Sequence, residues 1–282
     1  MPFFLSVCLS GCTSFFFRPT RTDYTAQWKE RDQYLSQNDF LQSKSGNRLN
    51  YWVFKSQIKN KKAKALIVQF HGNAQNLSIH FVSQGWLADF GYDFLTFDYS
   101  GYGKSEGKAN IKTALQDAES ILEFITQKAK QQNAPVILYG QSLGGALLLK
   151  SLKTKPKDFQ PCLTIIESSF YSYPKIAQSV AKKHWLLWPF QWVPLLSLSK
   201  KYNPGGKDLK LLEKYNKLVL HAKKDPIVPF AHGKKLFEQM SGSKDFWTYS
   251  KGHISFWQIS KNQQKLVQRL DRDSENCRKT AN

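Results

Sequence analysis

The feature that most constrains this fold is a serine placed between an apolar run and a helix-forming run. Residues 136–139 read Val-Ile-Leu-Tyr and predict a buried strand, whereas Ala146 to Leu149 favour a helix. Between them lies Gly140-Gln141-Ser142-Leu143-Gly144. A tight turn with a serine at its tip needs neighbours without side chains, so that the backbone bends and the hydroxyl stays open. The spacing therefore predicts that Ser142 is displayed at a strand-to-helix turn, facing the first N–H groups of the helix.

Length and charge bound the class of protein. The 282 residues suffice for one large domain, and 41% hydrophobic and 14% aromatic residues are typical of a globular chain. The net charge of +20 favours anionic partners such as nucleic acid, acidic lipid head groups or anionic envelope polymers, or simply a soluble basic surface. Because the lysines are spread along the chain and no nucleic-acid-binding motif is present, we expect no nucleic-acid partner.

The four cysteines form no obvious framework. Cys8 and Cys12 lie in the apolar N-terminal stretch, Cys162 opens an expected core strand, and Cys277 lies in a polar tail. Neither a CxxC pair nor a His/Cys cluster suggests zinc. We therefore expect no metal site, and we interpret Cys162 as a small buried hydrophobic residue.

Residues 1–17 are apolar but too short for a membrane-spanning helix of about 20 residues. Leu9-Ser10-Gly11-Cys12 resembles the lipobox of bacterial lipoproteins, which would make Cys12 a lipidation site. No positively charged region precedes it, so either the true start lies upstream or the match is accidental. A plain hydrophobic anchor and a packing arm are the alternatives. For a lipoprotein, Thr13 after the cysteine would favour the outer membrane over the inner one.

The rest of the chain alternates strands and helices. Residues 18–48 are interpreted as a spacer and lead-in, and residues 49–270 as one α/β domain with a mainly parallel, doubly wound sheet. Residues 271–282 are interpreted as a frayed polar tail. Gly103-Lys104-Ser105 resembles the end of a phosphate-binding loop, but Asp98 stands where that motif needs glycine. We therefore expect no nucleotide and no cofactor.

Residues 171–201 break the alternation and are dense in large apolar groups. Lys182 and Lys183 precede this cluster, and Lys200 and Lys201 follow it. Its position suits a lid over the active site, which would either bind an acyl or aromatic substrate or touch a bilayer. The alternative is an insertion buried against its own domain.

A serine hydroxyl needs a base beside it, and a histidine base needs a carboxylate to hold its tautomer. Ser142, Asp225 and His253 occur along the chain in the order nucleophile, acid, base, each just after an expected strand. Glu167, which ends an earlier strand, is the alternative acid. The remaining histidines fall within strands, helices, loops or the insertion and are weaker candidates for the base: His71, His80, His184, His221 and His232.

One further segment completes the expected site. An apolar strand ends at His71-Gly72, which resembles the His-Gly that supplies an oxyanion-hole N–H in hydrolases with a strand-to-helix serine turn. This resemblance implies an oxyanion hole made by the N–H of Asn73 or Ala74 together with that of Leu143. His71 itself is interpreted as a structural residue that holds this loop.

These motifs together resemble the Bem46-like branch of the α/β-hydrolase superfamily. The resemblance spans roughly residues 48–270 and rests on five segments: His71–Ala74, Asp98–Gly107, Gly140–Gly144, Asp225–Pro229 and Gly252-His253. It implies the α/β-hydrolase fold and a serine hydrolase that cleaves an ester or thioester without a cofactor. Because the insertion is apolar, we expect an acyl or lipid-like substrate. The alternative is a non-catalytic envelope or lipid-binding protein on the same fold.

Overall fold

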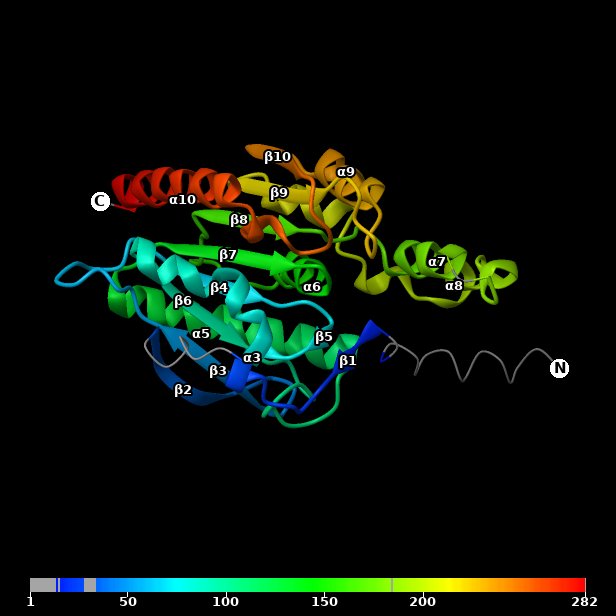
Figure 1. Ribbon diagram of the computed structural model, residues 1–282, viewed down its shortest axis with the longest axis horizontal. Coiled ribbons are helices and arrows are strands. Elements are labelled where there is room, and N and C mark those ends of the chain that lie inside the picture. Colours follow the sequence, from blue (N-terminus) through cyan, green and yellow to red (C-terminus); the bar gives the residue numbers. More distant parts are fainter. Residues whose placement is uncertain (1–13, 15, 28–33, 184, 282) are drawn as a thin grey trace.

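The computed structural model describes residue 14 and residues 16–27, 34–183 and 185–281 (Figure 1). Within this part of the chain, eight strands form the main sheet. In spatial order they are β10 (Lys244–Tyr249), β9 (Lys217–Ala222), β8 (Leu163–Glu167), β7 (Val136–Gln141), β4 (Leu66–Phe70), β6 (Asp93–Phe97), β3 (Arg48–Phe54) and β2 (Leu35–Gln42).

The sheet is mainly parallel, and its centre is buried on both faces. Strands β10 to β6 all run parallel, whereas β3 is antiparallel to both β6 and β2. Every residue of the central strands β4 and β7 is buried. Continuous apolar strands are expected where helices cover both faces of a parallel sheet. Because β10 to β6 run parallel, their carboxyl ends share one edge of the sheet, where the candidate residues lie.

Helices cover the two faces in separate layers (Figure 1). On one face, α5 (Ile111–Gln132), α6 (Leu143–Ser151) and α9 (Phe230–Gln239) contribute to one hydrophobic core. On the other face, a second core contains residues of α3 (Leu77–His80), η3 (Trp86–Phe90) and α10 (Ser260–Ala281), with α4 (Val82–Gly85) between the first two. This doubly wound arrangement confirms the expected fold class.

Short elements gather around the strand ends. The insertion contains α7 (Tyr173–Lys183), η4 (Trp188–Phe190), α8 (Val193–Ser197) and η5 (Lys200–Tyr202), followed by η6 (Lys207–Leu212). In Figure 1, α7 and α8 lie on the side toward which the β7 arrow points. A second, two-stranded sheet pairs β1 (Arg18–Pro19) with β5 (Ala74–Gln75), and the remaining short helices are η2 (Thr25–Gln27) and η7 (Phe256–Gln258).

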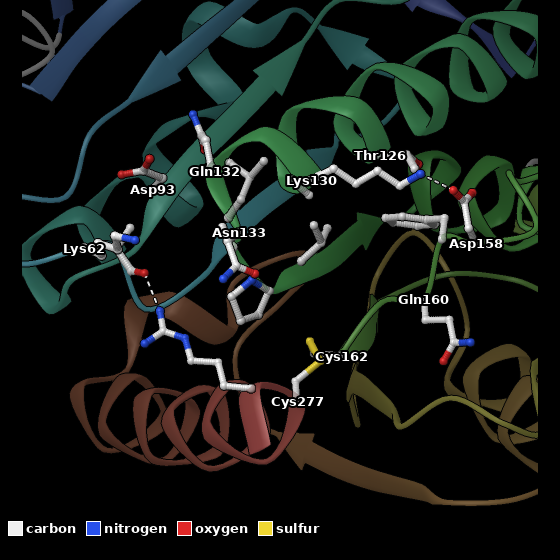
Figure 2. A pocket seen from close by; sticks show the side chains of 18 of the residues that line it. Lys62, Asp93, Thr126, Lys130, Gln132, Asn133, Asp158, Gln160, Cys162 and Cys277 are labelled. Atoms are coloured by element: carbon white, nitrogen blue, oxygen red, sulfur yellow. Dashed lines mark hydrogen bonds and ion pairs between the residues drawn. A yellow bond between two sulfur atoms is a disulfide. The ribbon is translucent and has the colours of Figure 1, made fainter. Parts of the chain in front are cut away.

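The expectation of a frayed tail and an unpaired Cys162 is wrong. Helix α10 continues through Ala281, and Cys277 on it forms a disulfide with Cys162 at the start of β8, with Cα atoms 5.6 Å apart (Figure 2). The helix persists beyond residue 270 because polar side chains in this part of α10 form buried ion pairs. Arg269 Nε donates to Asp273 Oδ2 at 2.8 Å, and both of these side chains are buried.

The stretch expected as a spacer contributes an edge strand. Strand β2 pairs with β3 along its length, although all of its residues are exposed or half-buried. A polar sequence at a sheet edge lacks the continuous apolar pattern by which central strands are predicted.

None of the described helices is long and apolar enough to cross a bilayer. Cys12, the candidate lipidation site, lies outside the described residues, as does Cys8.

Candidate active site

Ser142 occupies a strained turn between β7 and α6. Its φ of 51° and ψ of −117° lie in a region that residues with side chains rarely adopt. The flanking glycines permit close packing of this turn. A Cβ atom at Gly140 would lie 2.6 Å from the Gly145 Cα, and one at Gly144 would lie 2.0 Å from the Phe70 carbonyl oxygen. The glycine spacing noted in the sequence is therefore a steric requirement.

The next strand holds the same turn from its other side. The Ser142 N–H donates to the Glu167 carbonyl oxygen at 2.9 Å. The Ser169 hydroxyl donates to the Ser142 carbonyl oxygen at 2.7 Å. These bonds fix the backbone of Ser142 between two parallel strand ends.

His253 and Asp225 form a hydrogen-bonded pair. His253 Nδ1 lies 2.9 Å from Asp225 Oδ2 and 3.1 Å from Oδ1. The Asp225 side chain is fully buried, and that of His253 is 12% exposed. The N–H groups of Ile227 and Val228 also donate to Asp225 Oδ1, each at 2.9 Å. This arrangement orients the His253 ring with Nδ1 toward the carboxylate.

The surroundings of Asp225 favour its ionised form. Burial raises the pKa of this carboxyl, but the hydrogen bond and charge of His253 and the two backbone N–H groups lower it. The balance leaves the Asp225 pKa below its ordinary value of 3.8. A buried anion beside the imidazole stabilises a positive charge that develops on His253.

Ser142 and the loop that carries His253 meet at Gly72. A Cβ atom at Gly72 would lie 3.7 Å from the Ser142 Cβ and 3.4 Å from Cδ1 of Ile254, the residue after His253. The structure therefore brings the three strand-end segments that carry Ser142, Asp225 and His253 to one edge of the sheet.

The loop after β4 lies beside the same point. Asn73 and Ala74 directly follow Gly72, and Leu143 is the first residue of α6, where a helix leaves its N–H groups without intrahelical acceptors. The Asn73 carbonyl accepts bonds from the Arg18 N–H at 2.9 Å and from the Tyr102 hydroxyl at 2.7 Å. These two bonds to the Asn73 carbonyl hold the loop in its place next to Ser142.

The segment that holds this loop was not predicted as part of the site. Phe16 packs edge-on against Tyr173 with ring centroids 5.0 Å apart, and its carbonyl accepts a bond from the Asn73 amide at 3.3 Å. Phe17 is buried against Tyr102. Residues 16–18 therefore cross the candidate oxyanion loop. The apolar pair at 16–17 is the one signal in the sequence, and it fits the alternative of a packing arm.

Glu167, the alternative acid, is engaged elsewhere. Its carboxylate accepts bonds from Tyr139, Gln141, Tyr249 and the Phe256 N–H at 2.9–3.1 Å. Burial raises its pKa, and these four donors partly offset that effect. The carboxylate therefore connects Gln141, which precedes the serine, with the segment after His253. The geometry favours Asp225 as the carboxylate partner of His253.

Four other histidines are buried or half-buried within the fold. His71 Nδ1 lies 2.7 Å from the Gly72 carbonyl, and its ring stacks on His80, in keeping with a role in holding the loop. Burial lowers the pKa of His80 to about 3 and that of His232 to about 4. His221 Nε2 donates to the Val228 carbonyl at 3.0 Å. His184 lies outside the described residues.

A cavity of about 660 Å³ lies far from this site, beside the Cys162–Cys277 disulfide at the amino ends of β7 and β8 (Figure 2). Charged groups in its wall pair with each other: Lys130 with Asp158, and Lys55 with Asp93. Across the described residues, no group of three or more His, Cys, Asp or Glu side chains is arranged to hold a metal ion.

Comparison with known proteins supports a hydrolase of this fold. Residues 61–217 match the family described as serine aminopeptidase, S33. An uncharacterised protein of Escherichia coli, YfhR, is 28% identical over 207 residues, which are 73% of this chain and 69% of that protein. Chicken lysophosphatidylserine lipase ABHD12 is 29% identical over 203 residues, covering 68% of this chain but only 51% of the lipase.

Solved structures show the same α/β-hydrolase fold. The Pyrococcus furiosus esterase Pf2001 superposes with a TM-score of 0.67 at 14% identity, covering 93% of this chain and 98% of that one. An esterase from Exiguobacterium antarcticum gives 0.56 at 19% identity, covering 85% and 100%.

Proposed function

We propose that this chain, which belongs to the serine aminopeptidase S33 family of α/β-hydrolases, cleaves a carboxylic ester or thioester through an acyl-enzyme. The observation that carries the proposal is the hydrogen-bonded pair of His253 and Asp225 at the same sheet edge as a serine on a strained turn. Ser142 is the nucleophile, His253 the general base, and Asp225 the carboxylate that orients the base.

The steps follow from this geometry. With Nδ1–H directed to Asp225, the Nε2 atom of His253 is the one that accepts a proton. Ser142 Oγ attacks the acyl carbonyl while its proton passes to His253. Collapse of the tetrahedral intermediate expels the alcohol or thiol, which takes that proton. Water then attacks the acyl-serine with His253 again as base, releasing the acid and restoring the serine.

The oxyanion of the intermediate is assigned to the N–H of Leu143 with that of Asn73 or Ala74. Support comes from the position of Leu143 at a helix N-terminus and from the contact of Gly72 with Ser142. Donors that are held before the reaction need no reorganisation when the charge develops. Loss of one such donor typically costs about 100- to 1000-fold in rate.

An acyl or lipid-like ester is the proposed substrate class. The names of similar proteins support it, since they include two esterases and a lysophosphatidylserine lipase. The match covers only 51% of the length of the lipase, so the substrate of the lipase is not transferred to this chain. The resemblance of the motifs to the Bem46-like branch points the same way.

The test is turnover of nitrophenyl esters and thioesters of increasing acyl length, with aminoacyl nitroanilides as the peptidase comparison. We expect ester or thioester hydrolysis that Ser142→Ala abolishes and that Ser36→Ala, a change at an exposed serine on β2, leaves unchanged. Nitroanilide cleavage without ester cleavage would contradict the proposed substrate class. No turnover by folded protein would favour a non-catalytic binding role.

We also propose a lipid-anchored location in the bacterial envelope, at the outer membrane, through Cys12. The disulfide between Cys162 and Cys277 supports a compartment outside the cytosol, because disulfides persist in oxidising surroundings. Incorporation of an alkyne-labelled fatty acid tests this assignment. We expect labelling of the wild type and of Cys8→Ser but not of Cys12→Ser. Equal labelling of the two variants, or none of the wild type, would contradict it.

A further inference from the structure

Over residues 185–196, between α7 and η5, the insertion exposes several large apolar side chains. We call this set the aromatic face; its members and their exposed fractions are Trp185 (82%), Leu186 (64%), Trp188 (59%), Phe190 (63%), Trp192 (59%) and Leu196 (89%). The expectation of an insertion buried against its own domain is therefore wrong for these residues. Monomeric soluble proteins rarely leave such patches in water, so a partner is needed to cover it.

We propose that the aromatic face docks onto an anionic lipid bilayer. Tryptophan is suited to this partner because its ring is amphipathic and concentrates at the level of the lipid head groups. The docking does not depend on the proposed hydrolase activity. Only its consequence, that the catalytic edge is turned toward membrane lipids, rests on that function.

Charge around the face matches an anionic surface. Residues 171–206 contain five lysines and no aspartate or glutamate. Lys182 Nζ lies 5.7 Å above the Trp192 ring, so cation and aromatic ring are presented together. Lysine ammonium groups next to interfacial aromatic side chains attract acidic head groups, and the attraction weakens as salt is raised.

The face adjoins the catalytic edge. Lys183 at the end of α7 donates from Nζ to the carbonyl of Pro226 at 2.6 Å, and Pro226 directly follows Asp225. The start of α7 is tied to the N-terminal segment by the contact between Tyr173 and Phe16. Figure 1 shows α7 and α8 beyond the carboxyl end of β7, on the same side as β1.

The chain before the fold leads to the same membrane. Residues 1–12 are apolar and include Cys12, the proposed anchor. An extended chain spans at most about 3.6 Å per residue, so the four steps from Cys12 to Phe16 reach no farther than about 14 Å. An anchor at Cys12 therefore keeps the catalytic edge, with the aromatic face beside it, close to one bilayer.

Tryptophan quenching by brominated lipids tests the docking directly. The full chain carrying Ser142→Ala is mixed with vesicles of phosphatidylethanolamine and phosphatidylglycerol whose acyl chains are brominated. We expect vesicle binding and quenching of tryptophan emission, both weaker with phosphatidylcholine vesicles and at high salt. Replacing Trp185, Trp188 and Trp192 together by phenylalanine should preserve binding and remove most of the quenching.

A polar variant measures the contribution of the face and keeps all tryptophans. Phe190→Gln with Leu196→Gln is expected to weaken partitioning on the order of 100-fold, because two large apolar side chains no longer enter the bilayer. The matched control is Phe40→Gln with Phe90→Gln, which changes two apolar residues exposed by 41% and 42% on β2 and η3. This control should bind like the parent protein.

Three outcomes would overturn the proposal. The first is absence of quenching in the parent protein, even if the N-terminal segment holds it on vesicles. The second is equal binding and quenching by the polar variant. The third is a dimer that the polar variant abolishes in the absence of vesicle binding, which would assign the face to a second copy of the chain. The polar variant is also made in protein that keeps Ser142, and this protein should hydrolyse a soluble short-chain ester at an unchanged rate. Failure of docking and failure of catalysis are therefore separable.

Discussion

Removal of the Cys162–Cys277 disulfide is expected to destabilise the fold strongly. The bridge joins residues separated by 115 positions, and the loop-closure model assigns roughly 5 kcal/mol at 25 °C to a cross-link of that length. Replacing both cysteines by alanine should therefore lower the free energy of unfolding by about 4–5 kcal/mol. For a chain of this size, the expected fall in melting temperature is roughly 10 °C.

Urea unfolding of the double variant, measured without reductant, tests this magnitude. Wild-type protein unfolded in the presence of dithiothreitol is the control, and it should match the variant. The variant should retain α10 as far as residue 270, because Leu266 and Leu270 are buried in the hydrophobic core. A difference of less than about 1 kcal/mol between variant and oxidised wild type would refute the reasoning.

Three further changes test the site. Asp225→Asn should lower kcat by about 10⁴-fold, as measured by steady-state ester hydrolysis. Because the folded-state pKa of Asp225 is lowered, the stability that its ionised carboxylate contributes is present above about pH 4 and is lost as the pH falls further. Urea unfolding of the variant should therefore lack this acid dependence. Glu167→Gln should lower kcat with little change in KM, because its amide N–H₂ would face donors that now bind a carboxylate; an unchanged kcat would contradict the role of Glu167 in connecting the serine and histidine segments. Gly144→Ala should prevent folding or cost several kcal/mol in urea unfolding, whereas Gly252→Ala, whose Cβ would lie 3.8 Å from its nearest neighbour, should be tolerated; equal stabilities would contradict the steric argument.

The central sheet and the strand-end cluster were predictable because both leave local patterns. Buried parallel strands read as continuous apolar runs, and the tight turn at Ser142 demands glycine on both sides. Ser142, Asp225 and His253 each follow an apolar run that predicts a strand, and parallel strands bring the positions after their carboxyl ends to one edge. The assignment of catalytic roles to these residues remains a prediction.

Features that depend on contacts between distant segments were not predictable. The pairing of Cys162 with Cys277 leaves no local pattern, since it requires α10 to run back along the sheet. The packing of Phe16 across the candidate oxyanion loop depends in the same way on tertiary structure. The apolar insertion was ambiguous because composition alone does not distinguish a buried element from an exposed one.

The most direct test of the account is labelling by a fluorophosphonate probe, followed by mass mapping of the modified peptide. Such probes react with a serine only where a neighbouring base activates its hydroxyl. We predict a single modification at Ser142 in the wild type, no labelling of Ser142→Ala, and much slower labelling of Asp225→Asn. An unlabelled Ser142 in folded wild-type protein, or labelling that persists in Ser142→Ala, would contradict the proposal that this serine is the nucleophile.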